Sequence, residues 1–512
     1  MKSLITIRDV MNRFNRSKTV RVLRSLAKKP GVKKEDVICL ALFLMGFFFF
    51  LWVFARIPLV PGVDGPYYLI QVRSLLVKGV LVYGDPPLTF YLLAFFTMLM
   101  GDIVLGIEVG VSLFCALSTL PMYFLVRRVT GKTYAGYLAM LLVIFSAFYI
   151  RMMTDFMKNA VGIFFLLSFI YCINDMALVG RSSRNLPLAL LFLLLTGLTH
   201  ILDFSVALLS LGLHLVIAIL FDVNRKSFAK NVVIMTLILT IFVTAALTRL
   251  SFFFTDFNKI LSFIQTLLAT LEKEPTPPIF LPRPGGPPIP INWIVLLVTI
   301  ALGFAVSAYE WRRKRKEPLI LLSVSTVMGI IFGLPFIPAQ WLWRLLVMEF
   351  IPSAYILSYG LSLIKKQTLA VFLAIICLVF FGAEAVEMAL SVRPTIDPAG
   401  YLDLREMKPK IPKNSVVILF VDPGIFYWIQ YVDEVDVAGP TLSPDLWKSY
   451  SHVLGLFRKD RAPFPIKDFR VIHTGRVYIL VEIPQNLNLN PQPNRRSSYW
   501  IVFRIVWTNR SS

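Results

Sequence analysis

The uncharged run VICLALFLMGFFFFLWVF, from Val37 to Phe54, constrains the fold of this chain more than any other feature of its sequence. A helix of about 17–25 apolar residues is long enough to cross the hydrocarbon core of a bilayer. Because this run is too long for an ordinary buried helix, it predicts a membrane span. The stretch that follows, PGVDGPYYLIQVRSLL (61–76), places a carboxylate, Asp64, near the exit of that span.

The composition of the whole chain agrees with a membrane protein. Of the 512 residues, 57% are hydrophobic and only 16% are charged. The net charge of +22 could indicate a nucleic-acid partner, but most basic residues fall in short clusters between apolar runs. Such clusters are typical of cytoplasmic loops, so we expect a bilayer and no nucleic acid as the partner of this charge. The four cysteines show no metal-binding spacing and are interpreted as packing residues.

Further apolar runs predict about eleven transmembrane helices, and hence a mainly α, polytopic membrane fold. The expected spans are 37–56, 103–126, 134–150, 157–179, 187–200, 203–221, 231–249, 291–311, 318–336, 343–363 and 368–390. Basic clusters separate alternate pairs of these spans, at 127–132, 181–184, 224–230, 312–316 and 365–366. They share one side with the basic arm 1–36. We therefore expect a cytoplasmic N-terminus, a plasma-membrane location and an uncleaved first span.

This orientation gives a transmembrane domain over 37–392 with two long external loops, 57–102 and 250–290. The apolar stretch 88–100 in the first loop predicts a short helix in the outer membrane interface, because a further span there would misplace the later basic clusters. The second loop combines an amphipathic stretch with a proline-rich connector. A long loop of this kind is a candidate lid.

The composition changes after Val392, and 393–512 is expected to form a small extracytoplasmic α/β domain and tail. Strands are predicted at 415–421, 469–473 and 477–483, and helices at 398–407 and 444–459. The apolar stretch 499–507 predicts either an extra strand or an interfacial segment.

Polar side chains gather at the external ends of the predicted spans. They are Asp64, Asp85, Arg151, Asp155, Lys158, Asn159, Thr199, His200, Asp203, Gln340, Arg344 and, somewhat deeper, Glu349. Charged groups near the hydrocarbon boundary cost free energy and usually face a cavity or a partner. Together they suit a reaction on a substrate whose tail stays in the bilayer, with cations for a phosphate and a carboxylate as base or metal ligand.

These side chains also have purely structural interpretations. Asp64 and Asp155 would each cap the helix that follows, which is compatible with catalysis. Arg151 and Lys158 would extend to the membrane interface, as long basic side chains do. His200 would be an ordinary residue at a helix end, and Arg344 would pair with Glu349.

Several of the motifs resemble those of a known superfamily. Asp64-Gly65-Pro66-Tyr67-Tyr68 opens the first external loop, and Gly84-Asp85-Pro86-Pro87-Leu88 follows within it. A second acidic motif runs from Asp155 to Asn159, and Trp343-Arg344 precedes the apolar run IPSAYILSYGL. Over most of the chain this order resembles the membrane glycosyltransferases of the C-type superfamily (GT-C). Its members include oligosaccharyltransferase catalytic subunits, protein O-mannosyltransferases and the aminoarabinose transferase.

The resemblance implies an activity and a set of site residues. The chain would transfer a sugar from a polyprenyl-phosphate or diphosphate donor to a lipid, glycan or protein acceptor on the outer face. Asp64 and Asp155 would be the catalytic carboxylates; either they hold Mg²⁺ or Mn²⁺, or one acts alone as base. Arg344, with Lys158, would neutralise the phosphate. Further substrate contacts are expected from Tyr67, Asp85, Asn159, His200 and Gln340.

The sequence also departs from this pattern and leaves alternatives open. Oligosaccharyltransferases read the acceptor with a motif beginning Trp-Trp-Asp, whereas Trp428 and Trp447 stand alone here, which argues against transfer to protein sequons. A lipid or small-molecule transporter is one alternative, although transporters usually show internal repeats and polar residues near the bilayer midplane. A non-catalytic scaffold with the same fold is the other.

Overall fold

The structure is a computed structural model of the full chain, and it describes residues 33–179, 185–249, 261–266, 268, 289–333, 339–460 and 469–485. These residues divide into two compact units. The first comprises the described residues of 33–59 and 72–392, and the second comprises those of 60–71 and 393–485. The second unit therefore takes in a piece of the first loop, the piece that carries Asp64.

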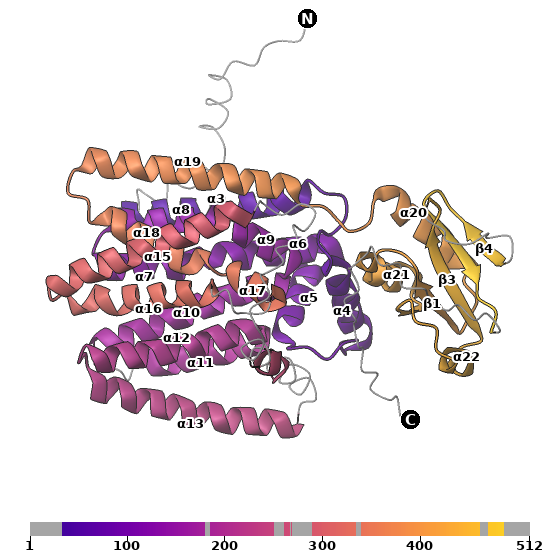
Figure 1. Ribbon diagram of the computed structural model, residues 1–512, viewed down its shortest axis with the longest axis horizontal. Coiled ribbons are helices and arrows are strands. Elements are labelled where there is room, and N and C mark those ends of the chain that lie inside the picture. The colour runs from indigo at the N-terminus through magenta and orange to yellow at the C-terminus, as the bar shows by residue number, and fades with distance from the viewer. Residues whose placement is uncertain are drawn as a thin grey trace, which may run out of the picture. The chain divides into compact units, whose positions relative to one another are not determined.

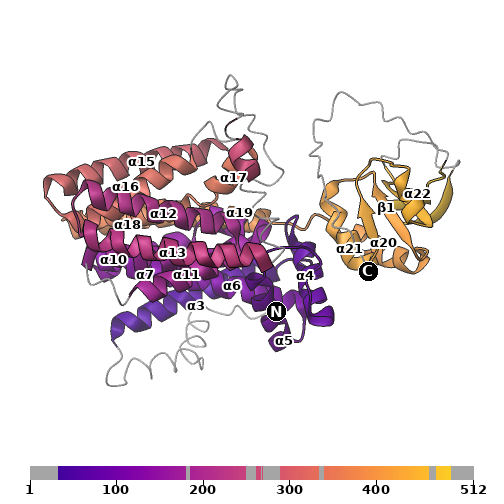
Figure 2. The ribbon, with the colours of Figure 1, turned by 90° about the horizontal axis from the view of Figure 1, so that it is seen from below.

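The first unit is built from helices, most of which lie side by side (Figures 1 and 2). They are α3 (Lys34–Ala55), α5 (Leu88–Met100), α6 (Ile103–Leu117), α7 (Thr119–Thr130), α8 (Thr133–Ile144), α9 (Ala147–Asp155), α10 (Met157–Val179), α11 (Asn185–Thr199), α12 (Ile201–Leu220), α13 (Arg225–Arg249), α15 (Ile289–Arg312), α16 (Lys316–Phe332), α17 (Ala339–Leu346), α18 (Phe350–Ser362) and α19 (Gln367–Ser391). Helix α4 (Gly65–Lys78) begins in the second unit and ends in the first.

The predicted polytopic membrane fold is confirmed. Within the described residues, eight helices are long and apolar enough to cross a membrane, and the pair α8 and α9, bent by 48°, makes a ninth if it is one span. The two other spans expected from the sequence are α11 and α16. They are helices of 15 and 17 residues, so each is shorter than a typical span.

The stretch 88–100 forms a helix, α5, at the residues predicted. Gly101 ends it in the left-handed conformation (φ 71°), and Asp102 caps the following helix by accepting a backbone N–H at 2.8 Å. A Cβ added to Gly106 would lie 2.4 Å from the Cα of Thr97, so only glycine lets α5 pack this closely on α6.

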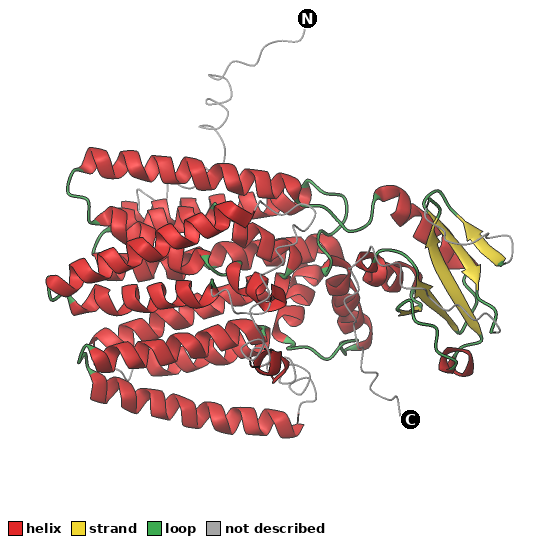
Figure 3. Cartoon of the chain, viewed as in Figure 1, coloured by secondary structure: helices red, strands yellow, loops and turns green. Residues whose placement is uncertain are grey.

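Strands within the described residues all belong to the second unit (Figure 3). Its elements are α20 (Pro398–Met407), η1 (Lys408–Lys410), β1 (Ser415–Leu419), η2 (Pro423–Ile425), α21 (Phe426–Asp433), β2 (Asp436–Ala438), α22 (Asp445–Ser449), β3 (His452–Arg458), β4 (Arg470–Thr474) and β5 (Tyr478–Glu482). The sheet order is β2-β1-β3-β5-β4, with β1 parallel to β2 and β3, and β5 antiparallel to β3 and β4. The three predicted strands and helix 398–407 are confirmed.

The predicted helix 444–459 is wrong over most of its length. Only α22 is helical there, and His452–Arg458 is the central strand β3. Five consecutive residues of β3 are buried. A strand buried on both faces is a continuous apolar run without alternation, and such a run does not distinguish a strand from a buried helix.

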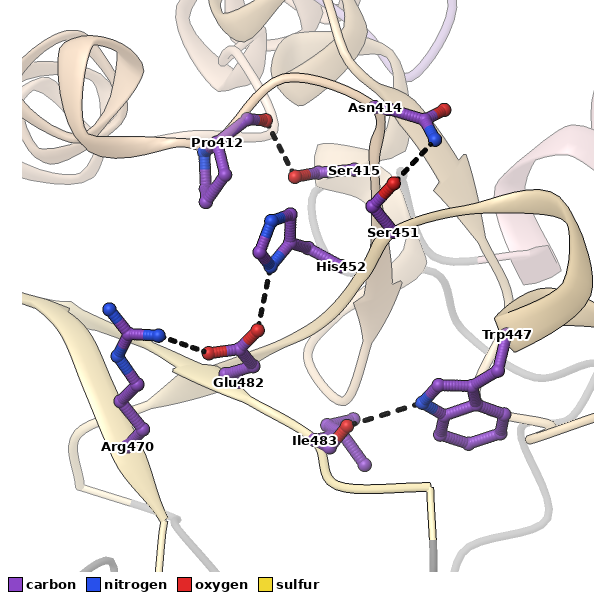
Figure 4. A network of polar contacts seen from close by, with 9 residues as sticks. All are labelled: Pro412, Asn414, Ser415, Trp447, Ser451, His452, Arg470, Glu482 and Ile483. Carbon is purple, nitrogen blue, oxygen red and sulfur yellow. Dashed lines mark hydrogen bonds and ion pairs between the residues drawn. The ribbon is translucent and has the colours of Figure 1, made fainter.

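A polar network ties three strands of this sheet together (Figure 4). Glu482 of β5 accepts hydrogen bonds from His452 Nδ1 of β3 at 2.7 Å and from Arg470 of β4 at 3.1 Å. The His452 hydrogen bond, with help from Arg470, holds the pKa of the Glu482 carboxyl below its usual value. One carboxylate thus links β5 to both of its neighbours.

Asp433, at the end of α21, is a buried carboxyl with no hydrogen-bond partner among the described residues. Burial raises its pKa to about 8, against a smaller opposing effect of Lys408. The folded state therefore keeps a proton on Asp433 that the unfolded state loses above about pH 4.

We expect the free energy of unfolding of this unit in the wild type to fall as pH rises from about 4 to about 8, by at most about 1.4 kcal/mol per pH unit. Asp433→Asn should remove that fall, because the amide does not titrate. Hydrogen exchange of the α21 amides in the full chain, corrected for intrinsic rates, measures this free energy at each pH. A variant as pH-sensitive as wild type would contradict it.

Two predictions fall outside the described residues. Most of the loop 250–290, including the proline-rich part of the candidate lid, is not described, and neither is the apolar stretch 499–507.

Candidate functional site

The residues predicted for the site fall in both units. Asp64 and Tyr67 belong to the second unit, whereas Asp85, Asp155, Lys158, Asn159, His200 and Arg344 belong to the first. Gln340 lies in α17, with its side chain outside the described residues.

A tight turn places Asp64 directly before α4. Gly62 has a left-handed φ of 75° and donates its N–H to the carbonyl of Arg393 at 3.2 Å. A Cβ on Gly65 would lie 2.8 Å from the Cγ1 of Val60, so the turn requires glycine there. The Asp64 carbonyl accepts the N–H of Tyr68 at 3.2 Å, which starts the helix. The Asp64 side chain is half-buried.

Tyr67 is buried inside the second unit. Its ring centroid lies 5.3 Å from that of Tyr427, and its hydroxyl accepts from Gln71 Nε2 at 3.2 Å. This contact fixes the first turn of α4 against α21.

Asp85 and Lys158 form a largely buried ion pair in the first unit. Asp85 Oδ1 lies 2.6 Å from Lys158 Nζ, with side chains 9% and 13% exposed. The ammonium also lies 5.7 Å from the ring centroid of Phe90. The pair joins the segment before α5 to the start of α10.

Breaking this pair by one substitution, Lys158→Met or Asp85→Asn, is expected to cost about 3–5 kcal/mol, because the remaining partner stays buried without compensation. The double variant should cost less than the sum of the two. Thermal unfolding of the detergent-solubilised protein provides the double-mutant cycle, and additive effects would contradict the prediction.

Asp155 ends α9 and faces Arg151 one turn earlier, with Asp155 Oδ2 at 2.7 Å from Arg151 Nε. Arg151 also stacks on Trp343 of α17, its Cζ 5.8 Å from the ring centroid. Arg344 of α17 stacks on Phe156, the residue between α9 and α10, with its Cζ 5.2 Å from the ring centroid. The same Cζ lies 5.8 Å from the ring centroid of Trp341. Two arginines thus interlock α17 with the α9–α10 junction.

Asn159 and His200 meet at a third carboxylate, Asp203, which is fully buried in the first turn of α12. The Asn159 amide contacts the Asp203 carboxyl, and with its nitrogen turned toward that group it donates to both oxygens, to Oδ2 at 3.1 Å. His200 Nδ1 lies 3.6 Å from the same Oδ2. The sequence analysis named Asp203 among the polar residues but predicted no role for it. A carboxylate within the apolar stretch ILDFSVALL was the signal that could have identified it.

The described residues of the first unit do not form a metal-binding site on their own. Among the described residues no group of three His, Cys, Asp or Glu side chains lies close enough to hold one. Asp155 already faces the Arg151 guanidinium, and the other half of the predicted metal pair, Asp64, belongs to the second unit. The Asp64–Asp155 metal pair stays a prediction.

The arrangement suits an anionic group at the end of the helical unit. Arg151, Lys158 and Arg344 lie at the α9–α10 junction or on α17, and each contacts an aromatic face. An aromatic face attracts a cation placed over it. An Arg fork matches the oxygens of a phosphate.

The family model described as dolichyl-phosphate-mannose-protein mannosyltransferase matches residues 84–258, a segment that contains Asp85, Asp155, Lys158, Asn159 and His200. No curated protein matches the chain by sequence at a significant level.

Two solved structures share the fold. The Archaeoglobus fulgidus oligosaccharyltransferase, in complex with Zn and sulfate, is 12% identical with a TM-score of 0.57 over 81% of this chain and 67% of that chain. ArnT from Cupriavidus metallidurans, bound to undecaprenyl phosphate, is 12% identical with a TM-score of 0.51 over 87% of this chain and 97% of that chain. The chain is therefore a multi-pass membrane protein with the fold of the GT-C superfamily, as its motifs predicted.

Proposed function

We propose that this protein is a membrane glycosyltransferase. It moves a sugar from a polyprenyl-phosphate or diphosphate donor to a hydroxyl-bearing lipid, glycan or protein at the extracytoplasmic face of the plasma membrane. The observation that carries the proposal is the interlocked pair Arg151 and Arg344 at the α9–α10 junction, inside or beside the segment matched by the mannosyltransferase model. The undecaprenyl phosphate bound to ArnT, which shares the fold, supports the lipid-phosphate donor.

The proposed mechanism is an inverting displacement. The acceptor hydroxyl oxygen attacks the anomeric carbon while Asp64 takes its proton. The bond from that carbon to the phosphate oxygen breaks, and the polyprenyl phosphate leaves with the electron pair. Arg344, with Lys158, neutralises the charge that develops on the leaving phosphate. Asp155 orients Arg151 through their ion pair.

A divalent ion such as Mg²⁺ or Mn²⁺, if held by Asp64 and Asp155, would supply further charge neutralisation at the phosphate. The steps above use only the side chains of this chain. Tyr67, Asp85, Asn159, His200 and Gln340 are proposed as substrate contacts around them.

The test is an assay on membranes that contain the protein, supplied with a native lipid extract and divalent metal. Mass spectrometry follows polyprenyl-phosphate sugars, with membranes carrying Asp64→Asn beside the wild type. We expect donor loss and free polyprenyl phosphate in the wild type alone. Equal donor levels in both, with both proteins folded, would reject the enzyme and favour a transporter or a scaffold.

A further inference from the structure

Two contacts within the second unit hold the turn that carries Asp64, one on each side of the carboxylate. Before it, the N–H of Gly62 donates to the carbonyl of Arg393 at 3.2 Å. After it, the ring centroid of Tyr67 lies 5.3 Å from that of Tyr427 in α21. The turn between these contacts is therefore fixed at both ends by residues of the second unit.

The partners in these two contacts are themselves joined. Thr395 donates its hydroxyl to the carbonyl of Gly424 at 2.7 Å and accepts the indole N–H of Trp428 at 3.1 Å. Thr395 belongs to the same segment as Arg393, and the fully buried Trp428 follows Tyr427 directly in α21. The segment that holds one end of the turn and the helix that holds the other end thus form one packed cluster.

The contact between Tyr67 and Tyr427 is made by the two rings. Their planes are tilted by 59°, and the ring of Tyr67 is buried. The hydroxyl of Tyr67 accepts a hydrogen bond from Gln71 within α4, so that group is satisfied inside the helix. Aromatic pairs of this kind contribute about 0.5–1.5 kcal/mol beyond the area that they bury. The ring of Tyr427 is therefore the part of that side chain that holds the first turn of α4.

We propose that Tyr427 is a positioning residue for Asp64. Its ring holds Tyr67, and through the first turn of α4 it sets the place of the carboxylate. This inference rests on the proposed function, in which Asp64 takes the proton of the acceptor hydroxyl. A general base must lie within about 2.6–3.2 Å of the group that it deprotonates, and a misplacement of about 1 Å can cost about 10²-fold in rate. The small second unit thereby contributes to catalysis through a residue that does not contact the substrate.

The test measures the initial rate of polyprenyl phosphate release in membranes supplied with native lipid extract. Tyr427→Ala should lower this rate by about 10–100-fold, while the affinity for added polyprenyl phosphate changes by less than about twofold. Tyr427→Phe keeps the ring and should stay within about twofold of the wild type. On the residual rate of Asp64→Asn, adding Tyr427→Ala should cost less than about twofold more, because no carboxylate is left to position.

Hydrogen exchange in the full chain gives a measurement that does not depend on activity. The amide of Tyr68 donates to the carbonyl of Asp64 at 3.2 Å, and its exchange should become faster in Tyr427→Ala. Phe420→Ala is the matched control, since Phe420 is also a half-buried aromatic residue of the second unit but stacks on Phe457 of β3, with ring centroids 4.6 Å apart. It should leave both the rate and the Tyr68 amide unchanged.

The outcomes separate this inference from the proposed function. An unchanged rate in Tyr427→Ala would overturn the inference, and so would a Phe variant as slow as the Ala variant. A loss that recurs in full in the Asp64→Asn background would show that Tyr427 acts by another route. An equal loss in Phe420→Ala would show general destabilisation, and either result would overturn the inference as well. An inactive wild type, or Asp64→Asn as fast as the wild type, would instead reject the proposed function, and the inference with it.

Discussion

Replacing Asp64 by asparagine is expected to lower the rate of sugar transfer by about 10²–10⁴-fold, the usual contribution of a general base. The amide has nearly the shape of the carboxylate but cannot take the acceptor's proton. The turn that carries it depends on Gly62, Gly65 and backbone hydrogen bonds, all of which the substitution leaves in place. The variant should therefore fold and insert like the wild type.

The measurement is the initial rate of release of polyprenyl phosphate at saturating donor, with donor affinity determined separately. Val63→Ala is the matched control, because Val63 is the exposed neighbour of Asp64 and has no proposed contact with substrate. We expect the loss of rate in Asp64→Asn with little change in donor affinity. Full activity in that variant would remove Asp64 from the chemistry.

The helices of the first unit were predictable because length and apolarity alone decide what crosses a bilayer. Apolarity failed as a criterion in the second unit, at His452–Arg458. A strand that is buried on both faces and a buried helix have the same apolar pattern. The bend between α8 and α9 was also missed. Ser146, which caps α9 by accepting the N–H of Tyr149 at 3.2 Å, is the local signal for it.

At the candidate site, the sequence identified the polar residues but not their pairing. Asp85 and Lys158 are 73 residues apart, so their ion pair depends on how α5 packs against the helical unit. Asp203 lay beside His200 in the sequence, yet its bond to Asn159 requires the contact between α10 and α12. The types of residue at a membrane boundary can thus be predicted from span ends, while their partners are fixed by helix packing.

Asp403→Ala is expected to destabilise the second unit by about 2–4 kcal/mol, since a buried N–H left without its partner costs about 1–3 kcal/mol, and the substitution leaves one buried and two partly buried N–H groups unpaired. The Asp403 carboxylate accepts backbone N–H groups from the turn between β4 and β5, those of Arg476 at 2.9 Å and Val477 at 2.6 Å, and from the first residue of β5, Tyr478, at 2.9 Å. Burial alone would raise the pKa of this carboxyl, but the three hydrogen bonds outweigh it and hold the pKa below its usual value.

A loss of this size is a large fraction of the stability of many small domains, about 5–15 kcal/mol, so the effect should reach beyond the turn. Hydrogen exchange of the β4 and β5 amides in the full-length protein should show protection falling across both strands. Asp445→Ala is the control, because Asp445 forms an exposed ion pair with Lys448 in the same unit and contributes little to stability. If Asp403→Ala loses protection only at the amides of Arg476, Val477 and Tyr478, the carboxylate orders the turn alone, and the prediction for the sheet is wrong.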